Sequence, residues 1–355
     1  MKKMKKLRSK IFVVLGLFAL MIADLNPFFV NAGRENLAYS HSAYLSAMFD
    51  NNLNTYTQYA ISTIGGNQAY CIDYGVRAPL ESASLSYIKT VRSNKLVSVI
   101  ANGYPNKTVA QLWAINIDAA YLGTQMAVWQ TVNGTSYTKG RNFDINKIQP
   151  AVGYENVVNN AKQVAANILA KNTYNPSIKV TGGNVDYDSY VEMNKIGPFK
   201  VTVVDYNYTV FEASVSNAPK GTYVVDKDNH IRSTYNKGED VYVLVDKNVD
   251  PTTVTLNIKA TANERVGVIY GASGNTLQNY VFLDFEQKEI NASTTFTWQK
   301  REGNIEIVKV DQNGASVAGA EFKVTDGAGK QVAKEKTNKD GKITVKGLPI
   351  GKYTV

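Results

Sequence analysis

Cys71 is the single cysteine among 355 residues, so the chain can form no internal disulfide bond. A thiolate is a strong nucleophile, and a lone thiol outside the cell is open to oxidation. If the protein is exported, as its first 32 residues indicate below, its one cysteine is either buried as an inert core residue or used in a reaction. The segment from Tyr70 to Gly75 predicts a strand that carries Cys71 and ends at the glycine.

The chain offers little that would activate this thiol in a hydrolase. A catalytic cysteine ordinarily gives its proton to an imidazole. The two histidines, His41 and His230, stand in no recognisable protease setting and fall in different predicted domains. One cysteine and two scattered histidines also cannot supply a closed tetrahedral metal site. We expect no cysteine protease or transpeptidase, no metal site and no cofactor.

A second candidate group lies further along the chain, in the segment 121–130. Leu122, Met126 and Trp129 recur there at helical spacing, which predicts an amphipathic helix that also carries Gln125. Taken alone, this glutamine would be read as a polar residue on a core helix.

Three motifs bring the two groups together. They are Tyr70-Cys71-Ile72, Asn102-Gly103-Tyr104-Pro105 and Thr124-Gln125-Met126-Ala127-Val128-Trp129. In this order they resemble the thioester domains of Gram-positive surface adhesins. The resemblance implies that the Cys71 thiol attacks the side-chain amide of Gln125, expels ammonia and leaves an internal thioester. It further implies that a lysine amine of a host or matrix protein displaces the thiol and becomes linked to Gln125.

The chemistry of such a bond agrees with its surroundings. A thioester reacts with amines at neutral pH because a thiolate is a good leaving group, and its acyl group is preserved only while water is excluded. Four aromatic residues beside the motifs are expected to wall the site: Tyr70, Tyr74, Tyr121 and Trp129. One reaction consumes the bond, so we expect single turnover rather than an enzyme. Asp73 and His41 are candidate proton shuttles.

Residues 1–32 predict a secretory signal peptide. Six basic residues lie within residues 1–10, an apolar run spans residues 11–22, and Val30-Asn31-Ala32 offers a cleavage site. An uncleaved anchor is the alternative, but the apolar run is short for the roughly 20 residues of a membrane span. Removal of this segment lowers the formal charge from +9 to +4, so the charge no longer supports nucleic-acid binding. The predicted mature chain contains no membrane span and is secreted.

The rest of the sequence predicts a mainly β protein with a helical subdomain. With 44% hydrophobic and 19% charged residues, the chain can build packed domains. Residues 33–178 are expected to form an α+β thioester domain that includes a helix near residues 155–171. Residues 179–300 show short alternating strands separated by turns, which predict a β-sandwich. Lys200 and Asn291 are candidates for an isopeptide cross-link there, because domains of this kind in such adhesins often carry one.

The last segment, residues 301–355, contains a lysine of particular interest. Strand alternation places Ile305, Ile307 and Lys309 on one face, and if that face is the core, burial would favour the neutral, nucleophilic amine of Lys309. This segment resembles the CnaB-type, prealbumin-like repeat of collagen adhesins. The resemblance implies an isopeptide bond from Lys309 to an Asn or Asp of the last strand, assisted by a Glu. Those positions would lie beyond residue 355, so we interpret the domain as truncated before a missing region that attaches the protein to the cell wall.

Two functions from different classes therefore stand beside each other. The first is a cell-surface adhesin that couples covalently to a host or matrix lysine through Cys71 and Gln125. The alternative is a non-covalent structural or pilin-like surface protein in which Cys71 is only packed. Release of a reactive thiol by methylamine would distinguish the first from the second.

Overall fold

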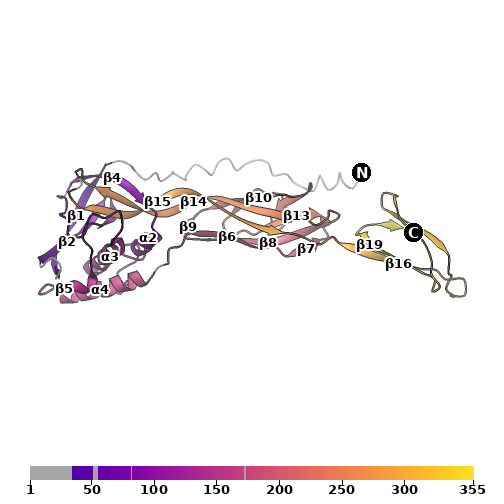
Figure 1. Cartoon of the computed structure of the whole chain (residues 1–355), viewed down its shortest axis with the longest axis horizontal. Helices are drawn as coiled ribbons and strands as arrows, with labels where there is room; N and C mark the ends of the chain where they lie inside the picture. Colours follow the sequence, from indigo (N-terminus) through magenta and orange to yellow (C-terminus); the bar gives the residue numbers. More distant parts are fainter. Residues whose placement is uncertain (1–33, 51–54, 81, 172, 275) are drawn as a thin grey trace.

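Strands dominate the molecule, and three α-helices of the described chain gather at one end of its elongated shape (Figure 1). The computed structural model describes residues 34–50, 55–80, 82–171, 173–274 and 276–355, with the side chains of residues 40–59 outside this description. The predicted signal peptide lies outside the described residues. No helix in the described ranges is long and apolar enough to cross a membrane.

The helices are α2 (Asn94–Ala101), α3 (Ile117–Val132) and α4 (Glu155–Ala170), with a short 3₁₀ helix η1 (Ile145–Lys147). The strands of the first half of the chain are β1 (Arg34–Asp50), β2 (Thr55–Ile64), β3 (Asn67–Cys71), β4 (Ser84–Val91), β5 (Ile148–Pro150), β6 (Ser177–Gly182) and β7 (Val185–Asp188). The remaining strands are β8 (Met193–Val204), β9 (Tyr206–Asn207), β10 (Val210–Ser216), β11 (Tyr223–Val225), β12 (Thr234–Asn236), β13 (Val241–Asp246), β14 (Val254–Gly271), β15 (Asn279–Phe296), β16 (Glu302–Val308), β17 (Glu321–Asp326), β18 (Gln331–Lys336), β19 (Lys342–Pro349) and β20 (Tyr353–Thr354). The predicted mainly β fold with a helical subdomain is confirmed.

A long hairpin of β14 and β15 joins the first two hydrophobic cores. The two strands pair without interruption from Val254 opposite Phe296 to Gly271 opposite Asn279. One end of the hairpin lies in the core formed with α2, α3 and α4, and the other end lies in the core formed with β6, β8 and β13. The expected division between residues 178 and 179 therefore does not separate the two cores, because residues 254–296 complete both.

The same hairpin reaches the cysteine strand. In the ten-stranded sheet, whose main path runs β12-β10-β14-β15-β3-β2-β1-β4, β15 lies directly beside β3. Tyr280 is opposite Cys71, and the Ile72 N–H donates to the Asn279 carbonyl at 2.9 Å. The strand that carries the thiol is thus held on one edge by β2 and on the other by a strand from the second half of the chain.

The middle part packs the sheet β11-β13-β8-β6 against the far end of the hairpin. Lys200 lies on β8 opposite Thr181, and Asn291 lies on β15 opposite Lys259. These two strands belong to different sheets, and both side chains are exposed. The structure does not bring the predicted pair together, because alternation along β8 turns Phe199 into the core and Lys200 away from it.

The C-terminal part contains a small core of Val324, Ile343, Val345 and Leu348. Lys309 follows the end of β16 and is exposed, with its ammonium donating to the Val310 carbonyl at 3.0 Å. The condition considered for a buried Lys309, that its strand face is the core, is not met in the described chain, because this residue lies one position after β16 and its side chain is exposed.

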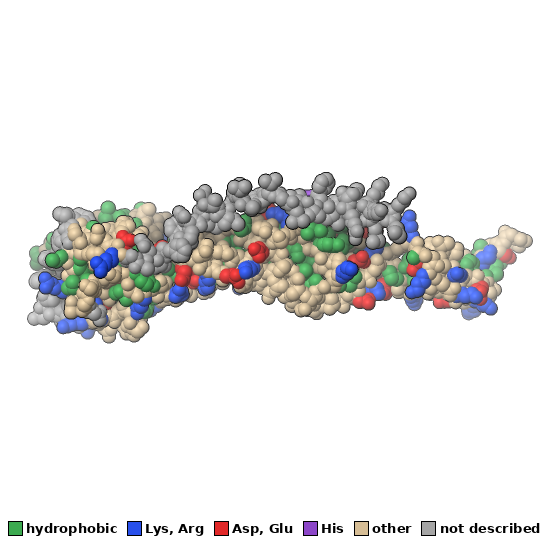
Figure 2. All heavy atoms as spheres, turned by 90° about the horizontal axis from the view of Figure 1, so that it is seen from above, with side chains coloured by type: hydrophobic (Ala, Val, Ile, Leu, Met, Phe, Trp, Pro, Cys, Tyr) green, Lys and Arg blue, Asp and Glu red, His purple; other side chains and the backbone are tan. Residues whose placement is uncertain are grey.

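Charged side chains of both signs are interspersed along the face shown in Figure 2. Lysine and arginine do not merge into one basic patch on this face.

Candidate functional site

Gln125 is carried by α3, the central helix of the first core. The side chain of Asn116 caps this helix by accepting from the Ala119 N–H at 2.8 Å. The helix is buried on nearly all faces rather than amphipathic as the spacing suggested. Gly123 allows α4 to lie close, since a Cβ atom here would fall 2.6 Å from Val164 and 2.8 Å from the Ala161 carbonyl oxygen.

Thr124 connects α3 to the turn that contains the Asn-Gly-Tyr-Pro motif. Its hydroxyl accepts from the Tyr104 N–H at 2.9 Å and donates to the Ala120 carbonyl at 2.8 Å. Gly103 lies against this side chain, and a Cβ atom at that position would be 2.2 Å from the Thr124 methyl group. The threonine and glycine of the two motifs are therefore a packing pair that fixes the turn beside Gln125.

Cys71 and Gln125 meet in the interior. The amide oxygen of Gln125 accepts from the Cys71 N–H at 2.9 Å, and its nitrogen donates to the Cys71 carbonyl at 2.7 Å. The two residues are only 5% and 2% exposed. The structure thus brings together the two groups that the motifs single out, with the amide fixed on the backbone of the cysteine by two hydrogen bonds.

One side of the site is walled by two tyrosines. Tyr70 stacks on Tyr121 with ring centroids 5.0 Å apart. The Tyr70 hydroxyl donates to the Tyr104 carbonyl, and the Tyr121 hydroxyl donates to the Ala69 carbonyl at 2.9 Å. Both rings are buried, and burial raises the pKa of both phenols. This wall remains neutral and holds β3 against α3.

The other side is walled by Tyr74, Trp129 and Phe143. The Tyr74 ring lies 4.9 Å from both other rings, and the Trp129 and Phe143 centroids are 5.2 Å apart. All three side chains are buried. The four residues predicted to wall the site thus lie in the same core as Cys71, and Phe143 joins them from a segment in which the sequence shows no motif.

Asp73 holds the backbone around the cysteine. Its carboxylate is fully buried and accepts from the Lys139 N–H at 2.8 Å, the Asn279 N–H at 2.7 Å and the Thr138 hydroxyl at 3.0 Å. The Lys139 ammonium lies 3.9 Å away. These contacts join β3, β15 and the segment after α3, so Asp73 acts as a structural anchor rather than a free proton shuttle. The side chain of His41, the other candidate shuttle, lies outside the described residues.

Burial dominates the electrostatics of the thiol. It raises the pKa of Cys71 to about 12, an effect partly offset by the nearby Trp129 N–H and by the Asp73 N–H. The Asp73 N–H donates to the sulfur at 3.3 Å. In this environment the free thiol stays protonated at neutral pH.

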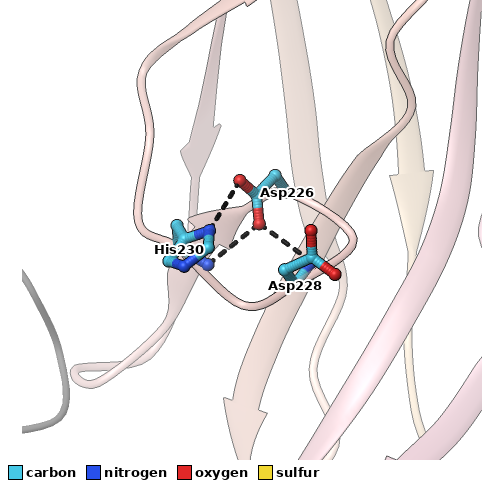
Figure 3. A group of neighbouring side chains, drawn as sticks. All are labelled: Asp226, Asp228 and His230. Atoms are coloured by element: carbon cyan, nitrogen blue, oxygen red, sulfur yellow. Dashed lines mark hydrogen bonds and ion pairs between the residues drawn. The ribbon is translucent and has the colours of Figure 1, made fainter.

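Three side chains of types that can bind a metal ion lie together in the turn after β11 (Figure 3). Ligand atoms of Asp226, Asp228 and His230 all lie within 4.8 Å of one another. The Asp226 carboxylate accepts from the backbone N–H groups of the other two residues at 2.9 and 3.0 Å and contacts His230 Nδ1 at 3.0 Å. These hydrogen bonds explain why the three side chains lie together, because Asp226 stabilises the turn.

Comparison with known families agrees with the geometry of the Cys71–Gln125 site. Residues 68–173 match the family model of the thioester domain, and residues 303–355 match that of the prealbumin-like fold domain. The chain therefore carries a thioester domain followed, after the middle sheet, by a prealbumin-like domain. No curated protein matches the chain by sequence.

Solved structures show the same fold over a longer stretch. The Bacillus anthracis TIE protein is 19% identical with a TM-score of 0.69, over 90% of this chain and 59% of that one. The thioester domain of the Enterococcus faecium TIE86 protein is 18% identical with a TM-score of 0.55, over 76% of this chain and 97% of that one. Both matches extend beyond residues 68–173, as expected if the β14–β15 hairpin is part of the thioester domain.

Proposed function

We propose that this protein is a secreted Gram-positive surface adhesin that forms a covalent bond with a lysine amine of a host or matrix protein through a Cys71–Gln125 thioester. The observation that carries the proposal is the buried amide of Gln125, fixed by two hydrogen bonds on the backbone of the single cysteine. A site that served packing alone would not require a glutamine amide beside the thiol.

Formation of the thioester requires one substitution at the Gln125 carbonyl carbon. The Cys71 sulfur bonds to this carbon, the bond to Nε2 breaks, and the thiol proton leaves with the nitrogen as ammonia. The Cys71 N–H already donates to Oε1, where negative charge develops in the tetrahedral intermediate. The Cys71 carbonyl accepts from Nε2 and orients the leaving nitrogen.

In the coupling step the Cys71 sulfur is the leaving group, whereas it was the nucleophile when the thioester formed. The partner's amine nitrogen bonds to the Gln125 carbonyl carbon, the bond to sulfur breaks, and the amine proton ends on the thiol. Proximity of a docked amine lowers the barrier, by roughly 7–11 kcal/mol in well-oriented cases. The reaction consumes the thioester and leaves an amide, which is a much poorer acyl donor, so we expect each molecule to react once.

The shape of the molecule supports display at a surface. The thioester domain lies at one end of the elongated molecule, and the described C-terminus lies at the other (Figure 1). Attachment to the cell wall through a region after residue 355 would project the site outward.

Amine trapping tests the proposal. Purified mature protein is incubated with methylamine and, separately, with a lysine-containing peptide, and the products are mapped by tandem mass spectrometry. We expect one adduct per molecule on Gln125, no further product on longer incubation, and none in Cys71→Ala or Gln125→Ala. An absence of adduct in the wild type would favour the alternative, a non-covalent structural protein with a packed cysteine.

A further inference from the structure

Trp129 carries a buried hydrogen-bond donor without an acceptor. Its indole N–H has no hydrogen-bond partner among the described residues, although the side chain is only 3% exposed. Such groups are rare in folded proteins, because burying a donor without an acceptor lowers the stability of the folded state. The other two tryptophans differ, since the Trp298 N–H donates to the Val249 carbonyl at 3.2 Å and Trp113 is 81% exposed.

The fold places the Trp129 N–H near Gln125 and Cys71. Trp129 follows Gln125 by four residues on α3, so the two side chains lie on the same face of the helix. Contacts with Tyr74 and Phe143 hold the indole ring in place. The N–H lies close enough to the Cys71 thiol to lower its pKa, but the contact lacks the geometry of a formed hydrogen bond.

The lack of an acceptor for the Trp129 N–H has a chemical reason. A neutral thiol is a weak acceptor, whereas a thiolate is a charged one and draws donors strongly. The sulfur has one formed hydrogen bond, from the Asp73 N–H at 3.3 Å. A second donor fixed nearby gains its partner only when charge appears on the sulfur.

On the basis of the thioester function proposed above, we propose that the Trp129 indole N–H stabilises the negative charge on the Cys71 sulfur in the transition states of thioester formation and opening. During formation, the N–H and the Asp73 N–H share the charge of the attacking sulfur. During opening, the electron pair of the broken carbon–sulfur bond moves onto the sulfur, and both N–H groups stabilise the resulting thiolate. The proton released by the incoming amine then converts the thiolate to the thiol.

The test substitutes Trp129→Phe, which keeps an aromatic ring and removes the N–H, and compares it with Trp113→Phe on the surface. Intact mass gives the fraction of each protein that has lost ammonia, and the rate of opening by methylamine is then measured across pH. We expect Trp129→Phe to form the thioester more slowly and to open about tenfold more slowly. This is less than the 10²–10³ typical of an oxyanion donor, since sulfur accepts more weakly. Trp113→Phe should match the wild type.

The outcomes separate the two proposals. A wild type that never loses ammonia would refute the thioester function, and this inference with it. A wild type that loses ammonia, together with a Trp129→Phe protein that forms and opens its thioester at wild-type rates, would overturn the role of Trp129 alone.

A second measurement applies if Trp129→Phe does not fold. In methylamine-opened wild type, the indole ¹⁵N–¹H resonance of Trp129 should shift as the Cys71 thiol ionises at alkaline pH. The shift should be missing in Cys71→Ser, which keeps every tyrosine. An indole resonance that moves equally in both proteins would overturn the inference.

Discussion

The Cys71–Gln125 pair and Lys309 illustrate opposite outcomes for residues singled out by motif. The Cys71–Gln125 pair is buried, and two hydrogen bonds between β3 and α3 hold its amide on the cysteine backbone. Lys309 matches the lysine position of a cross-linking family but is exposed at a strand end. Acyl chemistry of the kind proposed depends on excluding water. Burial meets this requirement at Cys71 and Gln125, whereas Lys309 in the described chain is exposed to solvent.

The largest expected effect comes from removing the anchor of the buried region. Asp73→Ala leaves the N–H groups of Lys139 and Asn279 without this buried acceptor and removes the carboxylate that lies 3.9 Å from the Lys139 ammonium. We expect a loss of about 3–5 kcal/mol in the free energy of unfolding of the thioester domain, measured in urea. The matched control is Asp311→Ala, an exposed turn carboxylate that accepts two backbone N–H groups and should cost about 1 kcal/mol. Equal losses would contradict the comparison.

Packing of the helix that carries Gln125 gives the next effect. Gly123→Ala forces α4 away from α3, because the new Cβ would lie 2.6 Å from Val164. We expect a cost of about 1–3 kcal/mol and slower thioester formation. The control is Gly303→Ala in the C-terminal region, where the nearest atom would be 3.8 Å away. A fully stable Gly123→Ala protein would show that the helices are less tightly packed than described.

The protonation state of the thiol gives a smaller effect, expressed as a rate. Burial raises the pKa of Cys71 from its ordinary value of 9.0 to about 12, so in the folded protein the thiolate fraction increases only as the pH rises toward 12. We expect iodoacetamide to label methylamine-opened native protein at pH 8 at least about tenfold more slowly than the urea-unfolded protein, so the thiol that methylamine releases becomes readily detectable only after unfolding. Equal rates would mean that the opened thiol is not buried.

The raised pKa of Cys71 also makes the free energy of unfolding depend on pH. Between about pH 9 and pH 12 the unfolded thiol ionises while the folded one stays protonated, so the contribution of Cys71 to stability falls as pH rises. Gln125→Ala, which retains the thiol, should therefore lose stability over this range faster than the double variant Cys71→Ala/Gln125→Ala. Parallel curves would contradict the burial of the thiol.

The smallest effects are expected at the exposed lysines. Lys200→Ala and Lys309→Ala remove side chains that face solvent, so each should change the free energy of unfolding by no more than about 0.5 kcal/mol. Neither should alter the mass lost as ammonia. A second ammonia loss that disappears with either substitution would reveal a cross-link and remove the contrast between the regions.

Short motifs singled out Cys71 and Gln125, and the four aromatic residues were predicted because they lie within or beside those motifs; the fold places the four rings in the same core as Cys71. The sequence could not predict that β15 lies beside β3, since alternation along a strand defines its inward and outward faces but not its neighbour. For the same reason Asn279 and Phe143 escaped notice, although each contacts the site. The character of α3 was also missed, because a helix buried on nearly all faces carries no amphipathic signature.

The bond between Cys71 and Gln125 is tested most directly by the intact mass of freshly purified mature protein. We expect a mass lower than that of the sequence by one ammonia, and the full mass in Cys71→Ala and Gln125→Ala once the substitution itself is allowed for. A wild type at full mass, with its thiol titratable after denaturation, would contradict this expectation.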